Sequence, residues 1–156
     1  MSPYVQTARD LIAAGQYAAV VDVCREALAT QPDDPRAHAL LGAAHLALGE
    51  PARALPSYQD AARLDPALVE AHYGVAAAHT ELEQFTDAIG AYRRVIDLRP
   101  DHAAAHHDLG VAQSRLKQYD DAAASFRRAI AIDPDSAWPH YSLGRVRREQ
   151  GRFDDA

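Results

Sequence analysis

The amino-acid sequence predicts an all-α fold in which helical hairpins stack into a solenoid, and three observations carry this prediction. Four prolines, Pro32, Pro66, Pro100 and Pro134, recur at a constant interval of 34 residues, and self-similarity at such a period is typical of repeat proteins. Hydrophobic residues make up 48% of the chain and aromatic residues only 7%. Alanine dominates this apolar fraction and favours helices that pack closely. Within each interval, apolar residues recur at helical spacing in two separate segments.

Further positions repeat with the same period and predict where the helices touch. We expect small residues where the two helices of a pair approach most closely, because only a small side chain lets their backbones come near. Aromatic rings are expected to fill the wider gaps toward the following repeat. The members are Gly42, Gly110 and Gly144, then Ala54, Ala88 and Ala122, and finally Tyr58, Tyr92 and Phe126. Gly74 and Gly90 are expected only to weaken their helices, by ~1 kcal/mol each relative to alanine.

Each repeat is expected to hold two helices, because its apolar segments begin at capping residues and end at glycine or at a turn. Asp34 before Pro35 predicts a capped first helix, and Thr86 is expected to cap a second helix. The expected helices span 3–14, 17–30, 35–48, 51–64, 67–82, 86–98, 103–116, 120–132 and 137–150. They form repeats over about 1–34, 35–68, 69–102 and 103–136, with a partial fifth over 137–156, in a single domain over 1–156.

This unit of 34 residues, with its Leu-Gly, alanine, aromatic and proline landmarks, resembles the tetratricopeptide repeat. The second repeat carries them as Leu41-Gly42, Ala54, Tyr58 and Pro66, and the resemblance covers essentially the whole chain. It implies a right-handed solenoid of helical hairpins with four full repeats and a partial fifth. It also implies a concave groove, lined by the first helix of each pair, that binds a peptide or a partner segment. The resemblance says almost nothing about which partner binds.

Carrying the groove positions of this family over to the sequence gives one face of each first helix. Toward the C-terminus that face becomes aromatic and basic, and tyrosine and arginine are favoured anchors in protein interfaces. We therefore expect the partner-binding residues to be Arg36, Tyr73, His107, Trp138, Tyr141, Arg145 and Arg148.

The histidines are an unusual feature of the repeats. One recurs with the period of the repeat, and two copies carry a second histidine seven residues later: His38, His72, His106 and His140, then His45 and His79. Seven residues of helix separate such a pair by about 10 Å along the axis, too far for both rings to hold one metal ion. His102 and His106 are four residues apart and could share a metal. The plainer interpretation is that the column histidines are partly buried with hydrogen-bonded ring nitrogens, and a pH-sensitive scaffold is a third alternative.

Composition and motifs argue against several classes of function. The formal net charge is −6 with both signs interspersed, whereas nucleic-acid-binding proteins present a basic face. No apolar run approaches the ~20 residues that a membrane-spanning helix needs. Cys24 is the only cysteine and falls among core positions, where a buried inert thiol is expected. The glycine-rich phosphate loops and the nucleophile and zinc motifs of enzymes are missing, so we expect no catalysis, no metal site and no cofactor.

We therefore expect a cytoplasmic, non-catalytic scaffold or adaptor whose groove binds another protein or a peptide. Two alternatives stay open at this point. In the first alternative, the chain is an accessory repeat region of a longer enzyme, for example a glycosyltransferase. In the second, it is a self-assembling module that stacks through an open C-terminal end. The segment 151–156 motivates both, because it repeats the opening of a second helix and then stops.

Overall fold

A computed structural model of the chain describes residues 3–151, and within that range every regular element is an α-helix. The helices are α1 (Pro3–Ala13), α2 (Tyr17–Thr30), α3 (Pro35–Ala47), α4 (Pro51–Leu64), α5 (Val69–Glu81), α6 (Phe85–Leu98), α7 (Ala103–Arg115), α8 (Tyr119–Ile132) and α9 (Ala137–Glu149). Their ends agree with the expected ends to within two residues, which confirms the all-α fold. Apart from Gly151, the second-helix opening expected over 151–156 lies outside the described residues.

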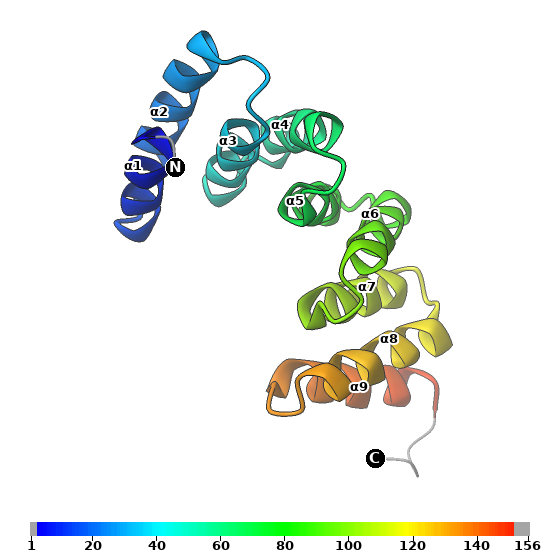
Figure 1. The fold of residues 1–156 in the computed structure, drawn as a ribbon. Coiled ribbons are helices and arrows are strands. Elements are labelled where there is room, and N and C mark those ends of the chain that lie inside the picture. The colour runs from blue at the N-terminus through cyan, green and yellow to red at the C-terminus, as the bar shows by residue number, and fades with distance from the viewer. Residues whose placement is uncertain (1–2, 152–156) are drawn as a thin grey trace. The chain divides into compact units, whose positions relative to one another are not determined.

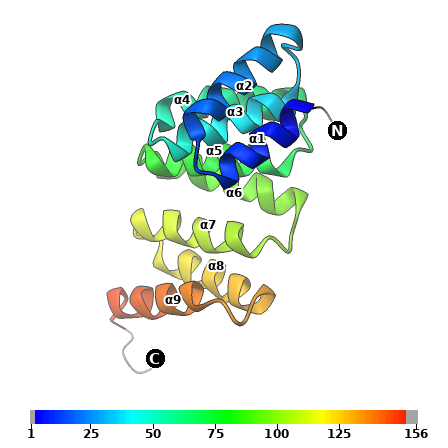
Figure 2. The ribbon, with the colours of Figure 1, turned by 90° about the vertical axis from the view of Figure 1, so that its left-hand side faces the viewer.

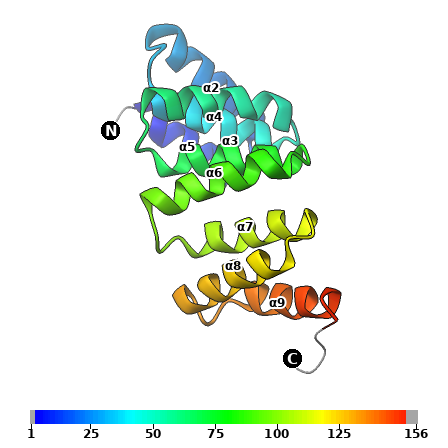
Figure 3. The same ribbon diagram turned by 90° about the vertical axis from the view of Figure 1, so that its right-hand side faces the viewer.

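The chain divides into two compact units, Met1–Leu82 with α1 to α5 and Glu83–Ala156 with α6 to α9. In the first unit each helix packs against the next, and α3 also contacts α1 and α5. In the second unit α7 packs against α6 and α8, and α9 packs against α8 and α7. Figure 1 labels these helices, and Figure 2 and Figure 3 show α7, α8 and α9 following one another as a stack. Within the units, α1 with α2, α3 with α4, and α7 with α8 form helical hairpins, as predicted. The single domain and its repeat boundaries stay predictions.

The short turn before each of α2, α4, α6 and α8 is closed by the backbone rather than by a side-chain cap. One turn residue takes a positive φ in every case: Gly15 at 70°, Gly49 at 74°, Glu83 at 57° and Lys117 at 58°. In the last of these turns, the following amide of Gln118 donates back to the carbonyl oxygen of Gln113 at 2.9 Å. This pattern satisfies carbonyl groups that the end of a helix leaves open.

The compact turn also sets where the second helices begin. Helix α6 starts at Phe85, directly after Gln84, and Gln84 makes no side-chain cap. The predicted cap at Thr86 is therefore wrong, because Thr86 already lies in the first turn of the helix. The prediction for the first helices is confirmed at α3, where Asp34 Oδ1 accepts from the backbone N–H groups of Arg36 and Ala37 at 2.9 and 3.3 Å.

Aromatic rings of the second helices pack directly onto glycines of the first helices. Tyr58 of α4 is buried, and a Cβ atom added to Gly42 of α3 or to Gly74 of α5 would come within 2.8 Å or 2.2 Å of its ring. Phe126 of α8 is fully buried and meets Gly110 of α7 in the same way, at 2.7 Å. These distances are too short for any side chain, so the glycines are required for the helices to approach. Gly42 and Gly110 are close-contact points within their helix pairs, as expected, but they contact the aromatic ring of the second helix rather than its backbone.

Two glycines differ from the sequence-based expectation. Gly74 does more than weaken α5, because the space of its missing side chain is filled by the Tyr58 ring. Gly144 was expected to be a close-contact point, but nothing lies within 4 Å of the position that its Cβ would occupy. The physical reason is that no described helix follows α9 and brings an aromatic ring to it.

Each histidine of the repeated column ties its own helix to the loop that precedes it. The ring Nε2 lies at hydrogen-bond distance from the carbonyl oxygen of the proline six residues earlier. The pairs are His38–Pro32 at 2.8 Å, His72–Pro66 at 3.0 Å, His106–Pro100 at 3.0 Å and His140–Pro134 at 3.2 Å. Because a carbonyl oxygen only accepts, Nε2 carries the proton and donates it. This histidine–proline contact confirms that one ring nitrogen of each column histidine is hydrogen-bonded within the fold. His140 is exposed rather than partly buried as expected.

The same contact argues against a pH-sensitive scaffold. Both nitrogens of a protonated imidazole donate, so Nε2 keeps its hydrogen bond to the carbonyl after protonation. His45 also keeps its hydrogen bond when its ring is protonated, because its Nδ1 lies 2.6 Å from Glu50 Oε2, which only accepts. That hydrogen bond holds the pKa of the Glu50 carboxyl below its ordinary value.

We predict that Gly74→Ala destabilises the protein, whereas Gly90→Ala stabilises it. Overpacking against Tyr58 costs about 1–3 kcal/mol at position 74, which outweighs the gain in helix propensity. Gly90 of α6 is exposed with nothing within 4 Å of its missing Cβ, so alanine there gains about 0.5–1 kcal/mol. Urea unfolding followed by circular dichroism measures both values, and equal changes in the two variants would contradict the packing described here.

Removing one histidine–proline contact is predicted to cost more at His106 than at His140. His106 is only 8% exposed and its contact with Pro100 is partly buried, so His106→Phe removes this hydrogen bond and costs about 0.5–1.5 kcal/mol of unfolding free energy. His140 is exposed, and water replaces its hydrogen bond in His140→Phe. Chemical unfolding of the two variants tests this order, and an unchanged stability of His106→Phe would show that the contact contributes nothing.

Candidate partner-binding site

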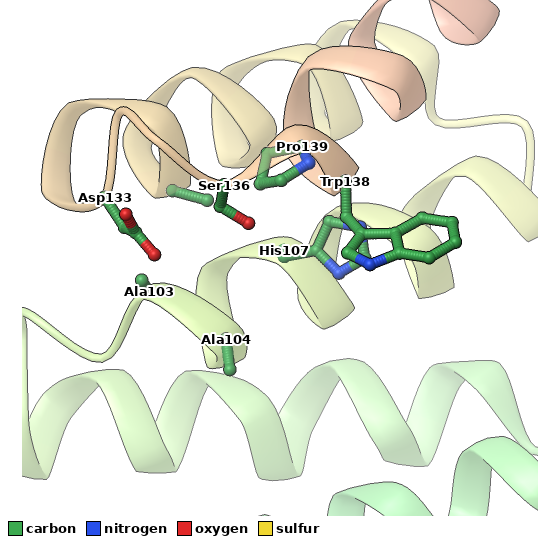
Figure 4. A pocket seen from close by; sticks show the side chains of 8 residues that line it. Ala103, Ala104, His107, Asp133, Ser136, Trp138 and Pro139 are labelled. Carbon is green, nitrogen blue, oxygen red and sulfur yellow. The ribbon is translucent and has the colours of Figure 1, made fainter.

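A pocket of about 400 Å³ lies in the second unit, between the beginnings of α7 and α9 and the end of α8. We call it the Trp138 pocket, and it is lined by Ala103, Ala104, His107, Ala129, Asp133, Ser136, Trp138 and Pro139. Figure 4 shows Asp133 and Ala103 toward one end of the pocket and His107 and Trp138 toward the other. Most of the wall is apolar, with polar groups at a few points, which is the usual character of a ligand pocket.

Small side chains and a short connection create this space. Three of the lining residues are alanines, so neither α7 nor α8 fills the volume that separates it from α9. Asp133 is the C-cap of α8 and Ser136 is the N-cap of α9, so the loop between the two helices forms one edge. Pro139 is buried and fixes the first turn of α9 beside Trp138.

His107 is held in one orientation by its neighbours on three sides. Its Nδ1 lies 3.0 Å from Asp108 Oδ1, and its Nε2 lies 3.2 Å from Ser142 Oγ. Because the carboxylate only accepts, Nδ1 is the donor, and the Nε2 of a neutral ring accepts from the Ser142 hydroxyl. The ring also packs on Phe126, with a distance of 5.5 Å between ring centroids. The polar wall of the pocket is therefore preorganised.

One face of α9 continues from the pocket along the helix. Trp138, Tyr141, Arg145 and Arg148 follow one another at steps of three and four residues, which places them on one side of a helix. All four are exposed, Trp138 by 71% and Tyr141 by 61%. We call this set the α9 strip. The buried residues of α9, among them Leu143 and Val146, lie on the opposite side and pack in the core of the second unit.

Five of the seven predicted binding residues belong to this arrangement. His107 and Trp138 line the pocket, and the other three complete the α9 strip. The remaining two lie in the first unit. Arg36 is exposed in the first turn of α3, and Tyr73 is half-buried in α5.

Sequence reasoning did not identify the loop side of the pocket. Asp133 and Ser136 look in sequence like a helix stop followed by a fresh cap, which gives no hint that they border a cavity. Ala129 belongs to a repeated small-residue column and was expected only in the core. The repeat period predicts that the end of α8 lies near the beginnings of α7 and α9, but it does not indicate whether the space between them is filled.

The order Asp108–His107–Ser142 resembles the acid–base relay of serine hydrolases, but its surroundings do not suit acyl transfer. Ser142 is only 6% exposed, and it lies inside α9, where the backbone N–H groups are used by the helix. The backbone N–H of Ser142 is therefore not free to stabilise an oxyanion beside this hydroxyl. Cys24 is fully buried, and burial raises the pKa of its thiol to about 11, with a smaller contribution from Asp34. Its thiol stays protonated and unreactive.

Residues 3–151 contain neither a cluster of side chains suited to a metal ion nor a helix suited to span a membrane. Within residues 3–151 no three histidine, cysteine, aspartate or glutamate side chains are grouped so that they could hold a metal ion. His102 and His106 instead use ring nitrogens inside the fold, on the Ala105 amide and on the Pro100 carbonyl. None of the described helices is both long enough and apolar enough to span a membrane.

Family models match nearly the whole length of the sequence. One described as "Tetratricopeptide repeat" matches residues 41–101 and 73–137, and two others with the same description match residues 11–56 and 125–156. The chain belongs to the tetratricopeptide repeat family. This membership confirms the resemblance that the repeated columns indicated. No curated protein matches the sequence.

Solved structures share the fold at low sequence identity. MamA from Desulfovibrio magneticus RS-1 superposes with a TM-score of 0.91 at 21% identity, covering 97% of this chain and 86% of that one. YrrB, described as a TPR protein with an unusual peptide-binding site, gives 0.81 at 22% identity and covers 89% of this chain and 72% of its own. A thermophilic TPR protein of Thermus thermophilus gives 0.78 at 23% identity, with 97% and 84% covered. At these identities the similarity establishes the tetratricopeptide repeat fold and no more.

Proposed function

We propose that this tetratricopeptide repeat protein is a scaffold or adaptor that binds an extended segment of a partner protein along α9. The observation that carries the proposal is the junction of the Trp138 pocket with the α9 strip. A concave, mostly apolar pocket there continues into exposed aromatic and cationic side chains on one helix face. Tryptophan, tyrosine and arginine are the residues that most often carry binding energy in protein interfaces.

The exposure of the aromatic residues supports this proposal. Among the large hydrophobic side chains of the described residues, Trp138 and Tyr141 are the two most exposed, at 71% and 61%. Contiguous exposed apolar surface, bordered by polar groups, is typical of interaction sites. Leu48 and Leu116 are also exposed, at 43% and 38%, but they lie singly at helix ends, where exposure needs no explanation.

The comparisons support the same class of function. Repeat proteins of this family generally act in protein interactions, and YrrB is described as having a peptide-binding site. Arg36 and Tyr73 also belong to the proposed partner-binding set. The only support for these two residues is that they occupy groove positions of the family. The accessory-region and self-assembly alternatives use the same fold, and no described contact favours either of them.

We further propose that the protein is not an enzyme and acts in the cytoplasm. The buried surroundings of Ser142 and Cys24 support the first statement. A lone cysteine kept as a free thiol fits a reducing compartment. The net charge of −6 supports a protein partner rather than a nucleic acid.

Panning a phage-displayed library of random dodecapeptides on the immobilised chain tests the proposed function. We predict that peptides are enriched and that the double variant Trp138→Ala, Tyr141→Ala no longer retains them. Truncating two central aromatic anchors typically costs about 2–4 kcal/mol, or roughly 30- to 1000-fold in affinity.

A matched control removes exposed apolar side chains elsewhere. The double variant Leu48→Ala, Leu116→Ala is expected to retain the peptides, and circular dichroism shows whether both variants are folded. If no peptide is enriched, or if the aromatic variant retains the peptides as well as the wild type does, the α9 site is not where the protein binds.

A further inference from the structure

The charges of α9 favour an acidic ligand. The helix contains three arginines against a single acidic residue, Glu149. Arg145 and Arg148 are exposed, and within residues 3–151 neither guanidinium group makes a hydrogen bond or ion pair to another side chain. Cations in the last turn also interact favourably with the helix dipole, which accounts for Arg148 without a ligand. It does not account for Arg145, which lies a turn earlier on the same face as Trp138.

The pocket at the other end of the strip favours an apolar anchor. Its alanines, Pro139 and Trp138 offer an apolar wall, and its volume of about 400 Å³ exceeds that of any single side chain. A large apolar side chain therefore fits together with part of the backbone on either side of it. Asp133 borders the end of the pocket away from Trp138 (Figure 4). Its carboxylate repels acidic groups there, so they are favoured only on the arginine side.

The geometry of α9 sets the spacing between the anchor and the acidic groups. Seven and ten residues of helix separate Trp138 from Arg145 and Arg148, which is about 10 and 15 Å at a rise of about 1.5 Å per residue. An extended peptide advances about 3.3 Å per residue, so it covers these distances in about three and four to five residues. Tyr141 lies between the two ends of the strip and is 61% exposed, so its ring is available to the intervening residues of a peptide.

We infer that the ligand of this site is an acidic peptide segment that carries one large apolar residue and, about three to five residues away, one or two carboxylates. The apolar side chain enters the Trp138 pocket, and the carboxylates bind Arg145 and Arg148. This inference rests on the proposed function and specifies the chemistry of the partner.

A protein segment is favoured over a nucleic acid as the source of the negative charges. Binding a phosphate backbone takes several cations on one surface. The α9 strip offers two arginines, and the second unit carries 11 lysines and arginines against 12 aspartates and glutamates. Two cations beside an apolar pocket match a short mixed peptide, which presents both kinds of group at once.

Fluorescence anisotropy with synthetic peptides tests the inference on the full chain. Two labelled decapeptides carry a leucine three residues from a pair of glutamates, in one order and in the reverse order, so both chain directions are presented. Each has a partner in which glutamines replace the glutamates. The better glutamate peptide is expected to bind about 2- to 30-fold more tightly than its glutamine partner, because two exposed ion pairs are gained. This advantage is expected to shrink as added salt screens the charges.

Two charge-reversal variants of equal size locate the acidic groups. Arg145→Glu, Arg148→Glu is expected to abolish the advantage of the glutamate peptide. Arg127→Glu, Arg128→Glu, which changes two exposed arginines of α8, is expected to keep it.

If the glutamate and glutamine peptides bind equally and Trp138→Ala weakens both, the inference is overturned while the proposed function stands. Absence of binding by all four peptides also overturns the inference, and the panning experiment then decides the proposed function independently. A glutamate advantage that survives Arg145→Glu, Arg148→Glu, or a duplex DNA probe that binds the strip better than the peptides, overturns it as well.

Discussion

The insertion of an aromatic ring against helix glycines is the contact on which the rest of the fold depends. Tyr58 occupies space that a side chain at Gly42 or Gly74 would need, and Phe126 does the same at Gly110. Because these rings are large and the glycines leave no free space, they fix which face of α3, α5 and α7 is buried. Helix α9 has no such contact at Gly144 and is oriented instead by Leu143 and Val146, which pack in the core of the second unit. Its outer face carries Trp138 and the two arginines of the strip.

The sequence predicted the fold well because one period controls packing, turns and loops together. A glycine column, an aromatic column and a proline column at the same interval leave little freedom for any other arrangement. The histidine–proline contact shows what periodicity alone could not reveal, since the column was visible but its hydrogen-bond partner was not. The turns were predicted less well. Thr86 has the chemistry of a cap, but backbone closure through a residue with positive φ places the helix start one residue earlier.

The candidate site was predicted in part, and the difference has a physical origin. Trp138, Tyr141, Arg145 and Arg148 were predicted by carrying the groove positions of the family over to this sequence, and helical spacing places them on one face. The pocket was not found, because a cavity arises from what neighbouring elements fail to fill. Small residues such as Ala103 and Ala129 look the same in sequence whether they permit close packing or leave a gap. Likewise, Gly74 looked like a weak point of α5 until the position of Tyr58 was known.

The central claim is that a partner covers the outer face of α9, and the fluorescence of Trp138 tests it most directly. Trp138 is the only tryptophan of the chain and is 71% exposed, so acrylamide should quench its emission strongly in the free protein. When a peptide selected by panning is bound to saturation, we expect the emission to shift to shorter wavelength and the quenching constant to fall. Unchanged quenching in the saturated complex would contradict the account, because the peptide would then be bound away from α9.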